Sequence, residues 1–320
     1  MMRFFFPFGV WAMQSLDLTK FDIVLQSSTH CAKYVKVSPS ALVITYCHTP
    51  FRLVWRPESY DKIYNARGIK RIAYNIVRAL LKRVDLKHAR RTDYFLANSK
   101  EVVERIKKAY TPRKEVEIIH PSVKCSKFYV SASIEDYYLV VSRFEPYKKV
   151  DLVVKAFTAM PNRKLIVVGK GSMEAELKAV AGSNIRFESN LSTEDIAKRY
   201  SLCKALIFPQ HEDYGITPLE ANASGRPVIA YGVGGVLETM LPYNGNAEKS
   251  TAVFFPEQTE ASLREAVDLF ETINFDPDFI RQHAETFDDP IFVKQYKAFV
   301  DSKIAEHFKE FAPGVPAEHD

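Results

Sequence analysis

The second half of this 320-residue chain alternates between short apolar runs and amphipathic stretches, and this alternation constrains its fold more than any other feature. Six apolar runs have the length of strands: Tyr138–Val141, Leu165–Val168, Ile185–Phe187, Ala205–Phe208, Val228–Ala230 and Ala252–Phe255. Helical stretches follow them, near Val150–Met160, Met173–Ala181, Thr193–Ser201, Thr217–Ala223, Gly235–Met240 and Glu260–Thr272. Buried strands that alternate with helices predict a parallel sheet covered on both faces. Such sheets bind ligands beyond the carboxyl ends of their strands, so the turns there form the candidate site.

The first half of the chain predicts four strands and one long basic helix. The strand-like runs are Asp22–Gln26, Leu42–Cys47, Tyr94–Ala97 and Val116–Ile119. The helix runs from about Gly68 to Arg91, and its apolar positions Ile72, Ile76, Leu80 and Val84 follow helical spacing. Other faces carry basic residues, namely Arg71, Arg78, Lys82, Arg83, Lys87, Arg90 and Arg91. Two interpretations stay open: a helix packed on the core with a solvated cationic back, or a helix on an anionic membrane surface. Nucleic acid is a third possible partner for such charge, but aromatic stacking residues are not interleaved on the polar face, which argues against it.

Charge is distributed unevenly along the chain. Residues 1–134 carry 24 Lys+Arg against 10 Asp+Glu, and residues 135–320 carry 20 against 29. The balance changes sign near Ser131-Ala132-Ser133, which we interpret as a linker. We therefore expect one domain at 1–134, a second at 135–290, and a C-terminal helix and tail at 291–320 that could pack back on the first. The basic first domain is expected to face an anionic partner.

Two features bear on where the protein works. The four cysteines lie far apart without a Cys-x-x-Cys pair, so we expect no metal site, no disulfide framework and a reducing, cytoplasmic compartment. The apolar run from Phe4 to Met13 has no small-residue cleavage site and is too short to span a bilayer. It predicts a buried or surface-seated segment.

Two of the turns that follow strands carry basic residues and glycines. In Ser142–Lys149, the guanidinium of Arg143 and the ammonium of Lys148 suit a diphosphate leaving group, although a solvated basic loop is an equal alternative. The segment Val168–Ser172 begins like a dinucleotide-binding motif but lacks the third glycine and the acidic residue. It favours a tight turn near the same ligand.

A third turn lies between two carboxylates. The apolar run ending at Phe208 leads into a polar loop with Glu212 and then into a helix with Glu220. Either carboxylate could accept hydrogen bonds from hydroxyls, Glu212 from a sugar and Glu220 from a ribose diol; alternatively, Glu220 only faces solvent. The amides at the start of this helix could hold an anion, and they belong to Gly215, Ile216 and Thr217. A further glycine-rich turn, Gly232–Gly235, opens the next helix.

In the first half, His48 follows the strand-like run that ends at Cys47. A lone histidine is usually structural. At the carboxyl end of a strand, a catalytic or substrate-binding role is an equal alternative.

These motifs together resemble those of a known family. Arg143 with Lys148, and Glu212 with Glu220 in a Glu-x7-Glu arrangement, are similar to the retaining glycosyltransferases of family four, which have the GT-B fold. Other similar segments are Ser142–Asp151, Glu212–Ile216, Gly225–Ile229, Tyr46–Pro50 and Ala97–Ser99. The pattern is nearest to bacterial GDP-mannose-dependent mannosyltransferases of polysaccharide and lipopolysaccharide assembly.

The resemblance implies an α/β protein with two Rossmann-like, doubly wound domains that face a cleft. Arg143 and Lys148 would hold the diphosphate, Glu220 the ribose and Glu212 the donor sugar, with the amides of Gly215 and Ile216 beside it. His48 would line the donor-sugar and acceptor side. No metal or other cofactor would be needed. Relative to the family the chain begins late, so we expect the first domain to lack its first strand and glycine-rich loop.

The leading hypothesis is therefore a hexosyltransferase, most simply a mannosyltransferase, that uses a nucleotide sugar such as GDP-mannose and a glycan or polyprenyl-diphosphate-linked acceptor. It would work in the cytoplasm or peripherally on the inner face of an anionic membrane. One alternative is a truncated sugar-nucleotide-binding protein without turnover. An epimerase is disfavoured, because no Tyr-x-x-x-Lys pair is evident in a suitable place.

Overall fold

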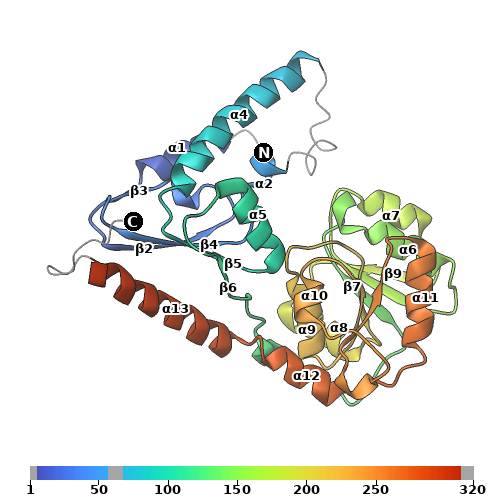
Figure 1. The fold of residues 1–320 in the computed structure, drawn as a ribbon. Helices are drawn as coiled ribbons and strands as arrows, with labels where there is room; N and C mark the ends of the chain where they lie inside the picture. The colour runs from blue at the N-terminus through green and yellow to red at the C-terminus, as the bar shows by residue number, and fades with distance from the viewer. Residues whose placement is uncertain (1–5, 57–67, 311–320) are drawn as a thin grey trace. The chain divides into compact units, whose positions relative to one another are not determined.

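The computed structural model of the chain describes residues 6–56 and 68–310 (Figure 1). These divide into two compact units: residues 1–120 with 293–320 form the first, and residues 121–292 form the second. The expected boundary near residue 134 therefore lies inside the second unit. Ser131 and Ser133 belong there because the buried Arg226 donates Nη2 hydrogen bonds to their carbonyl oxygens, at 2.7 Å and 3.4 Å. This segment is not a linker.

The second unit is built on a six-stranded parallel sheet in the order β12-β11-β10-β7-β8-β9. The strands are β7 (Tyr138–Val141), β8 (Leu165–Val168), β9 (Ile185–Glu188), β10 (Leu206–Phe208), β11 (Val228–Tyr231) and β12 (Ala252–Phe255). Each begins within one residue of the predicted run. The prediction of a parallel sheet in this half is confirmed.

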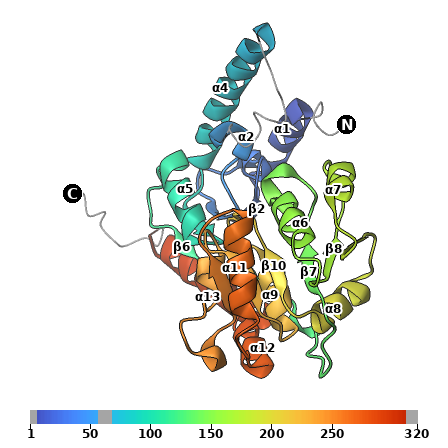
Figure 2. The ribbon, with the colours of Figure 1, turned by 90° about the vertical axis from the view of Figure 1, so that its right-hand side faces the viewer.

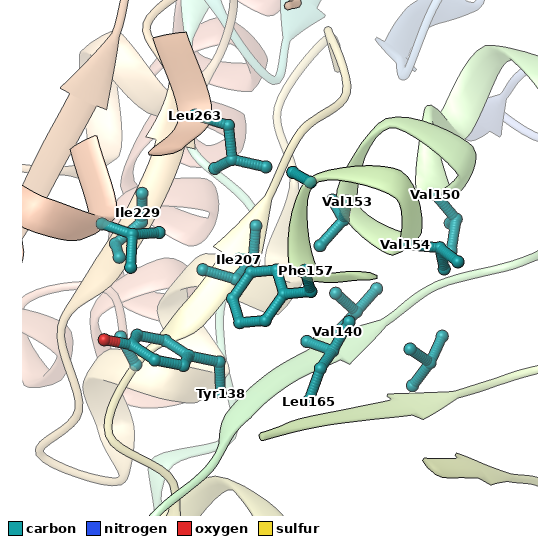
Figure 3. Packing of buried hydrophobic residues seen from close by; sticks show 14 of the residues in the cluster. Tyr138, Val140, Val150, Val153, Val154, Phe157, Leu165, Ile207, Ile229 and Leu263 are labelled. Carbon is teal, nitrogen blue, oxygen red and sulfur yellow. The ribbon is translucent and has the colours of Figure 1, made fainter. Parts of the chain in front are cut away.

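Helices cover both faces of this sheet. They are α6 (Val150–Thr158), α7 (Glu174–Val180), α8 (Thr193–Leu202), α9 (Ile216–Ala223), α10 (Val236–Thr239), α11 (Glu260–Phe270) and α12 (Pro277–Glu285). Alternate residues of β7 enter different cores: Tyr138 and Val140 pack with α6 and α11, and Leu139 with α8 and α9. Figure 3 shows the first of these cores, and Figure 2 shows α6 and α11 on the viewer's side of the sheet. This two-sided burial explains why the strands read as continuous apolar runs.

The first unit contains a four-stranded parallel sheet in the order β2-β4-β5-β6. The strands are β2 (Ile23–Ser28), β4 (Leu42–Cys47), β5 (Tyr94–Ala97) and β6 (Glu117–Ile118). All four were predicted. A separate two-stranded pair, β1 (Asp17–Leu18) with β3 (Lys36–Val37), was not.

The helices of the first unit are α1 (Phe6–Ser15), α2 (Arg52–Trp55), α4 (Ile69–Ala89) and α5 (Lys100–Tyr110). The long helix α13 (Asp289–Glu310) crosses the division between the units at residue 293. Within the first unit, its later turns contact β5 and the loop before β6: Phe299 packs edge-on against Tyr94, and Glu306 pairs with Lys114 at 3.0 Å.

The exposure of α4 contradicts one of the two interpretations of its apolar positions, namely that they pack on the core. Ile72, Ile76 and Leu80 are 61%, 57% and 53% exposed, and Val84 is half-buried. The predicted core-packed face therefore does not exist over the first turns. The helix instead contacts the unit through Asp85 and Ala89, which are both buried.

The N-terminal apolar run falls partly on residues that the structure describes. Phe4 and Phe5 lie outside them, and the rest of the run forms most of α1, where Trp11 is 62% exposed. Within residues 6–56 and 68–310, no helix is both long enough and apolar enough to cross a membrane.

Candidate active site

The candidate site of the second unit lies where the strand order of the sheet reverses. β7 comes first in the chain, β8 and β9 follow on one side of it, and β10, β11 and β12 lie on the other. The loops after β7 and β10 therefore leave neighbouring strands and turn in opposite directions. In open α/β sheets, ligands bind at this position.

The loop after β7 is held by the glycine turn that follows β8. Ser142 N donates to Val168 O at 3.0 Å, and Phe144 N donates to Lys170 O at 2.9 Å. A Cβ on Gly169 would lie 1.8 Å from Ser142 O, and one on Gly171 would lie 2.3 Å from Phe144 O. Both glycines are therefore needed for the close approach of two backbones. This is a tight turn that supports the basic loop, as the sequence favoured.

The two predicted cations of the β7 loop have different surroundings. Arg143 is exposed, and its Nη2 donates to the hydroxyl of Tyr147 at 2.8 Å. Lys148 is half-buried, and its Nζ forms an ion pair with Glu212 Oε1 of the β10 loop. The structure thus joins two sequence motifs that are 64 residues apart. An incoming diphosphate would compete with Glu212 for Lys148.

The loop that carries Glu212 is fixed by the glycines after β11. Gly235 N donates to Glu212 O at 3.0 Å. A Cβ on Gly234 would lie 2.3 Å from the same oxygen, and one on Gly235 would lie 2.3 Å from Tyr214 O. The expectation of an anion-binding turn here needs correction, because the Gly235 amide is already used to hold the Glu212 loop.

The helix α9 starts directly after this loop. Gly215 precedes it with φ 87°, and a Cβ there would lie 2.9 Å from Phe208 Cζ, so glycine fits both the backbone and the packing. No side chain in the described part of the chain caps α9, and its first turn holds no acidic residue. The amides of Ile216 and Thr217 and the positive end of the helix dipole therefore have neither a side-chain cap nor a carboxylate in the first turn of the helix, as an anion-binding helix start requires.

Glu220, on the same helix, is half-buried and has a defined partner. The hydroxyl of Tyr200, on α8, donates to Glu220 Oε2 at 2.8 Å. Burial raises the pKa of the Glu220 carboxyl above its ordinary value, and the hydrogen bond from Tyr200 lowers it in part. The alternative in which Glu220 only faces solvent is therefore wrong.

In the first unit, His48 follows β4 and is half-buried among polar groups. Its Nε2 lies 2.9 Å from Ser27 Oγ at the end of β2, and its ring packs edge-on against Tyr46 at 5.0 Å. Asn98 Nδ2, after β5, donates to His48 O at 3.2 Å. Burial lowers the pKa of the His48 imidazole, which favours the neutral ring at pH 7. The carboxyl edge of the first sheet thus gathers hydrogen-bonding groups around His48.

Comparison with family models gives two adjoining matches. The model described as Glycosyltransferase Family 4 matches residues 2–127, and the model described as Glycosyl transferases group 1 matches residues 127–286, which is half of the chain. The chain belongs to the glycosyl transferases group 1 family.

Several curated relatives of this family member are mannosyltransferases. It is 24% identical to the alpha-1,3/1,6-mannosyltransferase ALG2 of Kluyveromyces lactis, over 79% of this chain and 60% of that protein. It is 29% identical to the O-antigen chain mannosyltransferase C of Escherichia coli, over 42% and 36%. It is 33% identical to a GDP-mannose-dependent phosphatidylinositol monomannoside mannosyltransferase of Corynebacterium glutamicum, over 32% and 31%. The chain thus spans between about a third and three-fifths of these relatives.

Solved structures of glycosyltransferases share the fold. The sucrose-phosphate synthase of Thermosynechococcus elongatus superposes with a TM-score of 0.67 at 17% identity, covering 93% of this chain and 78% of that one. Anabaena HepE, in complex with UDP-glucose, gives 0.64 at 14% identity, covering 92% and 81%. The family member therefore has the predicted GT-B fold with two Rossmann-like units.

Sequence reasoning missed one partner of a candidate residue in each unit: Tyr200 beside Glu220 in the second, and Ser27 beside His48 in the first. Tyr200 lies at a buried helix position whose role depends on which strand-end loop the helix meets, and no local pattern reports this. Ser27 is the last residue but one of the edge strand β2, and the pairing of β2 with β4 brings it to His48. The register of β2 against β4 could have predicted the contact between Ser27 and His48, since Ser27 is paired with Tyr46, two residues before His48.

Replacing Tyr200 with phenylalanine tests the geometry around Glu220. We expect nucleotide binding to weaken about tenfold, because Glu220 loses a charge-assisted hydrogen bond that orients it. The same loss raises the pKa of Glu220 further, so the carboxylate is protonated at a higher pH. When the pH is lowered, the variant should therefore lose nucleotide binding before the wild type does. Calorimetric titration of the nucleotide across a pH series measures both effects. Tyr137→Phe is the matched control, since that hydroxyl donates to Arg199 O instead. Identical pH profiles for Tyr200→Phe and the wild type would contradict the assignment.

Proposed function

We propose that this protein is a retaining glycosyltransferase that moves a hexose from a nucleotide-diphosphate sugar to a glycan or lipid-linked acceptor in cell-surface polysaccharide or lipopolysaccharide synthesis. The observation that carries the proposal is the Lys148–Glu212 ion pair at the point where the strand order reverses, next to the uncapped start of α9. A cation, free amides and a hydroxyl-accepting carboxylate are the groups that a sugar diphosphate requires.

The arrangement suggests how the residues divide the work. Lys148, Arg143 and the start of α9 stabilise the negative charge that develops on the diphosphate as the sugar leaves. When Lys148 turns to the diphosphate, Glu212 loses its partner and can accept hydroxyls of the donor sugar. Glu220, oriented by Tyr200, accepts from the ribose diol. His48, neutral at pH 7, contributes a polar contact to the sugar or acceptor from the first unit. In this scheme these side chains and amides supply the charge stabilisation, and retention follows from attack on the face that the leaving group vacates.

The finer parts of the proposal are mannose as the sugar, GDP as the nucleotide and an acceptor at the membrane. Mannose is supported by the mannosyltransferase names of the relatives from Kluyveromyces lactis, Escherichia coli and Corynebacterium glutamicum. GDP and a lipid acceptor are supported by the name of the Corynebacterium glutamicum relative. A polyprenyl-diphosphate-linked acceptor would place the protein peripherally on the cytoplasmic face of a membrane, where nucleotide sugars are made.

Donor titration tests the proposal directly. GDP-mannose, UDP-glucose and UDP-N-acetylglucosamine are titrated by calorimetry, and nucleotide release is followed with and without a lipid extract. We expect GDP-mannose to bind most tightly and its release to depend on the extract. Glu220→Ala should abolish donor binding, because Glu220 accepts hydrogen bonds from the ribose of the nucleotide. His48→Ala should lower nucleotide release more than donor binding, because His48 does not contact the nucleotide.

The outcomes separate the alternatives. Binding that Glu220→Ala abolishes, without nucleotide release under any condition, would identify a binding protein without turnover. If none of the three donors binds, the proposal fails. The anomeric configuration of the product, read by NMR coupling constants, decides whether the reaction retains.

A further inference from the structure

One face of α4 presents apolar side chains to solvent. Ile72, Ile76, Val77 and Leu80 are each more than half exposed, at 61%, 57%, 52% and 53%. Because residues three or four apart share a side of a helix, Ile72, Ile76 and Leu80 form one stripe, and Val77 widens it beside Leu80. In Figures 1 and 2, the N-terminal half of α4 extends beyond the other elements of the first unit. The stripe has no partner among the described residues of that unit.

The same helix is strongly cationic. Between Ile69 and Ala89 it carries Lys70, Arg71, Arg78, Lys82, Arg83 and Lys87, against one acidic residue, Asp85. Asp85 is fully buried, so the surface of α4 displays cations alone. Arg83 and Lys87 are exposed and lie on the side of the stripe, one and two turns beyond Leu80.

Buried contacts prevent α4 from turning its stripe inward. Asp85 Oδ1 pairs with Lys33 Nζ at 2.7 Å and accepts from the Tyr34 hydroxyl at 2.6 Å. Asp85 Oδ2 accepts from Trp55 Nε1 at 2.7 Å. Rotation of the helix would break all three contacts and leave a buried charge unpaired, which is costly. The outward direction of the stripe is therefore built into the fold.

We propose that this face of α4 binds the surface of an anionic lipid bilayer, with the stripe among the upper acyl chains and Arg83 and Lys87 on the headgroups. The combination of an apolar stripe with cations and no exposed acid complements such a surface. A second copy of the same face would bring like charges together, and nucleic acid would leave the stripe in water. The inference deepens the membrane part of the proposed function and rests on it only for the identity of the acceptor.

Vesicle co-sedimentation of the full chain tests it. Vesicles of phosphatidylglycerol with phosphatidylethanolamine are compared with phosphatidylcholine vesicles at low and high salt. We expect binding to the anionic vesicles only, weakened by salt. The double variant Ile76→Glu/Leu80→Glu should lower the partition coefficient at least about tenfold. Arg83→Glu/Lys87→Glu should lower it by about fivefold or more for each removed cation and reduce its salt dependence.

Matched controls make the outcomes decisive. Leu269→Glu changes an exposed leucine of α11, and Lys198→Glu/Lys249→Glu reverses two exposed lysines of the second unit; neither should alter vesicle binding. Donor titration of every variant reports the nucleotide site separately, so loss of vesicle binding with intact donor binding supports the proposal. Equal sedimentation of Ile76→Glu/Leu80→Glu and the wild type overturns it. The proposal is also overturned if the wild type does not bind the vesicles but forms a dimer in solution that Ile76→Glu/Leu80→Glu dissociates.

Discussion

Lys148→Ala is expected to lower the turnover number by at least about a hundredfold. Removing one positioned donor to a developing negative charge commonly has this effect. Lys148 also compensates Glu212 in the absence of ligand, so its loss leaves a half-buried carboxylate that repels the diphosphate. Both consequences act in the same direction. Nucleotide release from GDP-mannose in the presence of acceptor gives kcat and KM for the comparison.

Two further variants separate these consequences. Lys148→Ala/Glu212→Gln removes the repulsive carboxylate but does not restore the cation. It should therefore regain donor affinity without regaining kcat. Lys155→Ala, at an exposed position of α6, should behave as the wild type. Full turnover in Lys148→Ala would contradict the role of Lys148 and leave the diphosphate to Arg143 and the start of α9.

Asp85→Asn is expected to destabilise the first unit by about 3–5 kcal/mol, since it leaves the ammonium of Lys33 buried and unpaired. Lys33 is only 5% exposed; its ammonium also donates to the carbonyl of His30 at 2.9 Å and lies over the rings of Tyr34 and Tyr110, but none of these groups carries a negative charge. A domain's whole stability is about 5–15 kcal/mol, so this single change removes a large part of it. The effect is far larger than that of an exposed pair such as Lys107 with Glu104, which contributes about 0–1 kcal/mol.

Tryptophan fluorescence during urea unfolding measures this prediction selectively. The chain has two tryptophans, and both Trp11 and Trp55 lie in the first unit. Asp85→Asn should shift the midpoint of the fluorescence transition to lower urea. Lys33→Met/Asp85→Leu should lose less than the two single changes added together, because no charge remains buried. A midpoint that Asp85→Asn leaves unchanged would contradict the buried ion pair.

The sequence predicted the second unit better than the first for a physical reason. Strands buried on both faces, such as β7 and β8, appear as short apolar runs with clear ends. The site loops follow from the carboxyl-end rule, which led to Arg143, Lys148 and Glu212 without any knowledge of their contacts. The ion pair between Lys148 and Glu212 depends on β7 and β10 being neighbours. No local sequence pattern predicts this strand order.

The helix α4 shows the opposite limit. Helical periodicity reports that Ile72, Ile76 and Leu80 share a side, but it does not report which side the protein covers. The contact that decides the matter is made by Asp85, a charged residue that periodicity assigns to solvent. Its partners come from η1 (Ala32–Tyr34) and α2, so only the tertiary structure reveals its burial.

The path of α13 across the division between the units has a consequence for dissecting the protein. Residues 121–292 form one uninterrupted segment, so the second unit can be excised with a single pair of cuts. The first unit is discontinuous in sequence, and a fragment ending at residue 120 would leave Tyr94 and Lys114 without the helix that covers them. The first unit therefore needs both of its separate stretches of chain to be complete. During synthesis the first unit can be completed only after the second has been made.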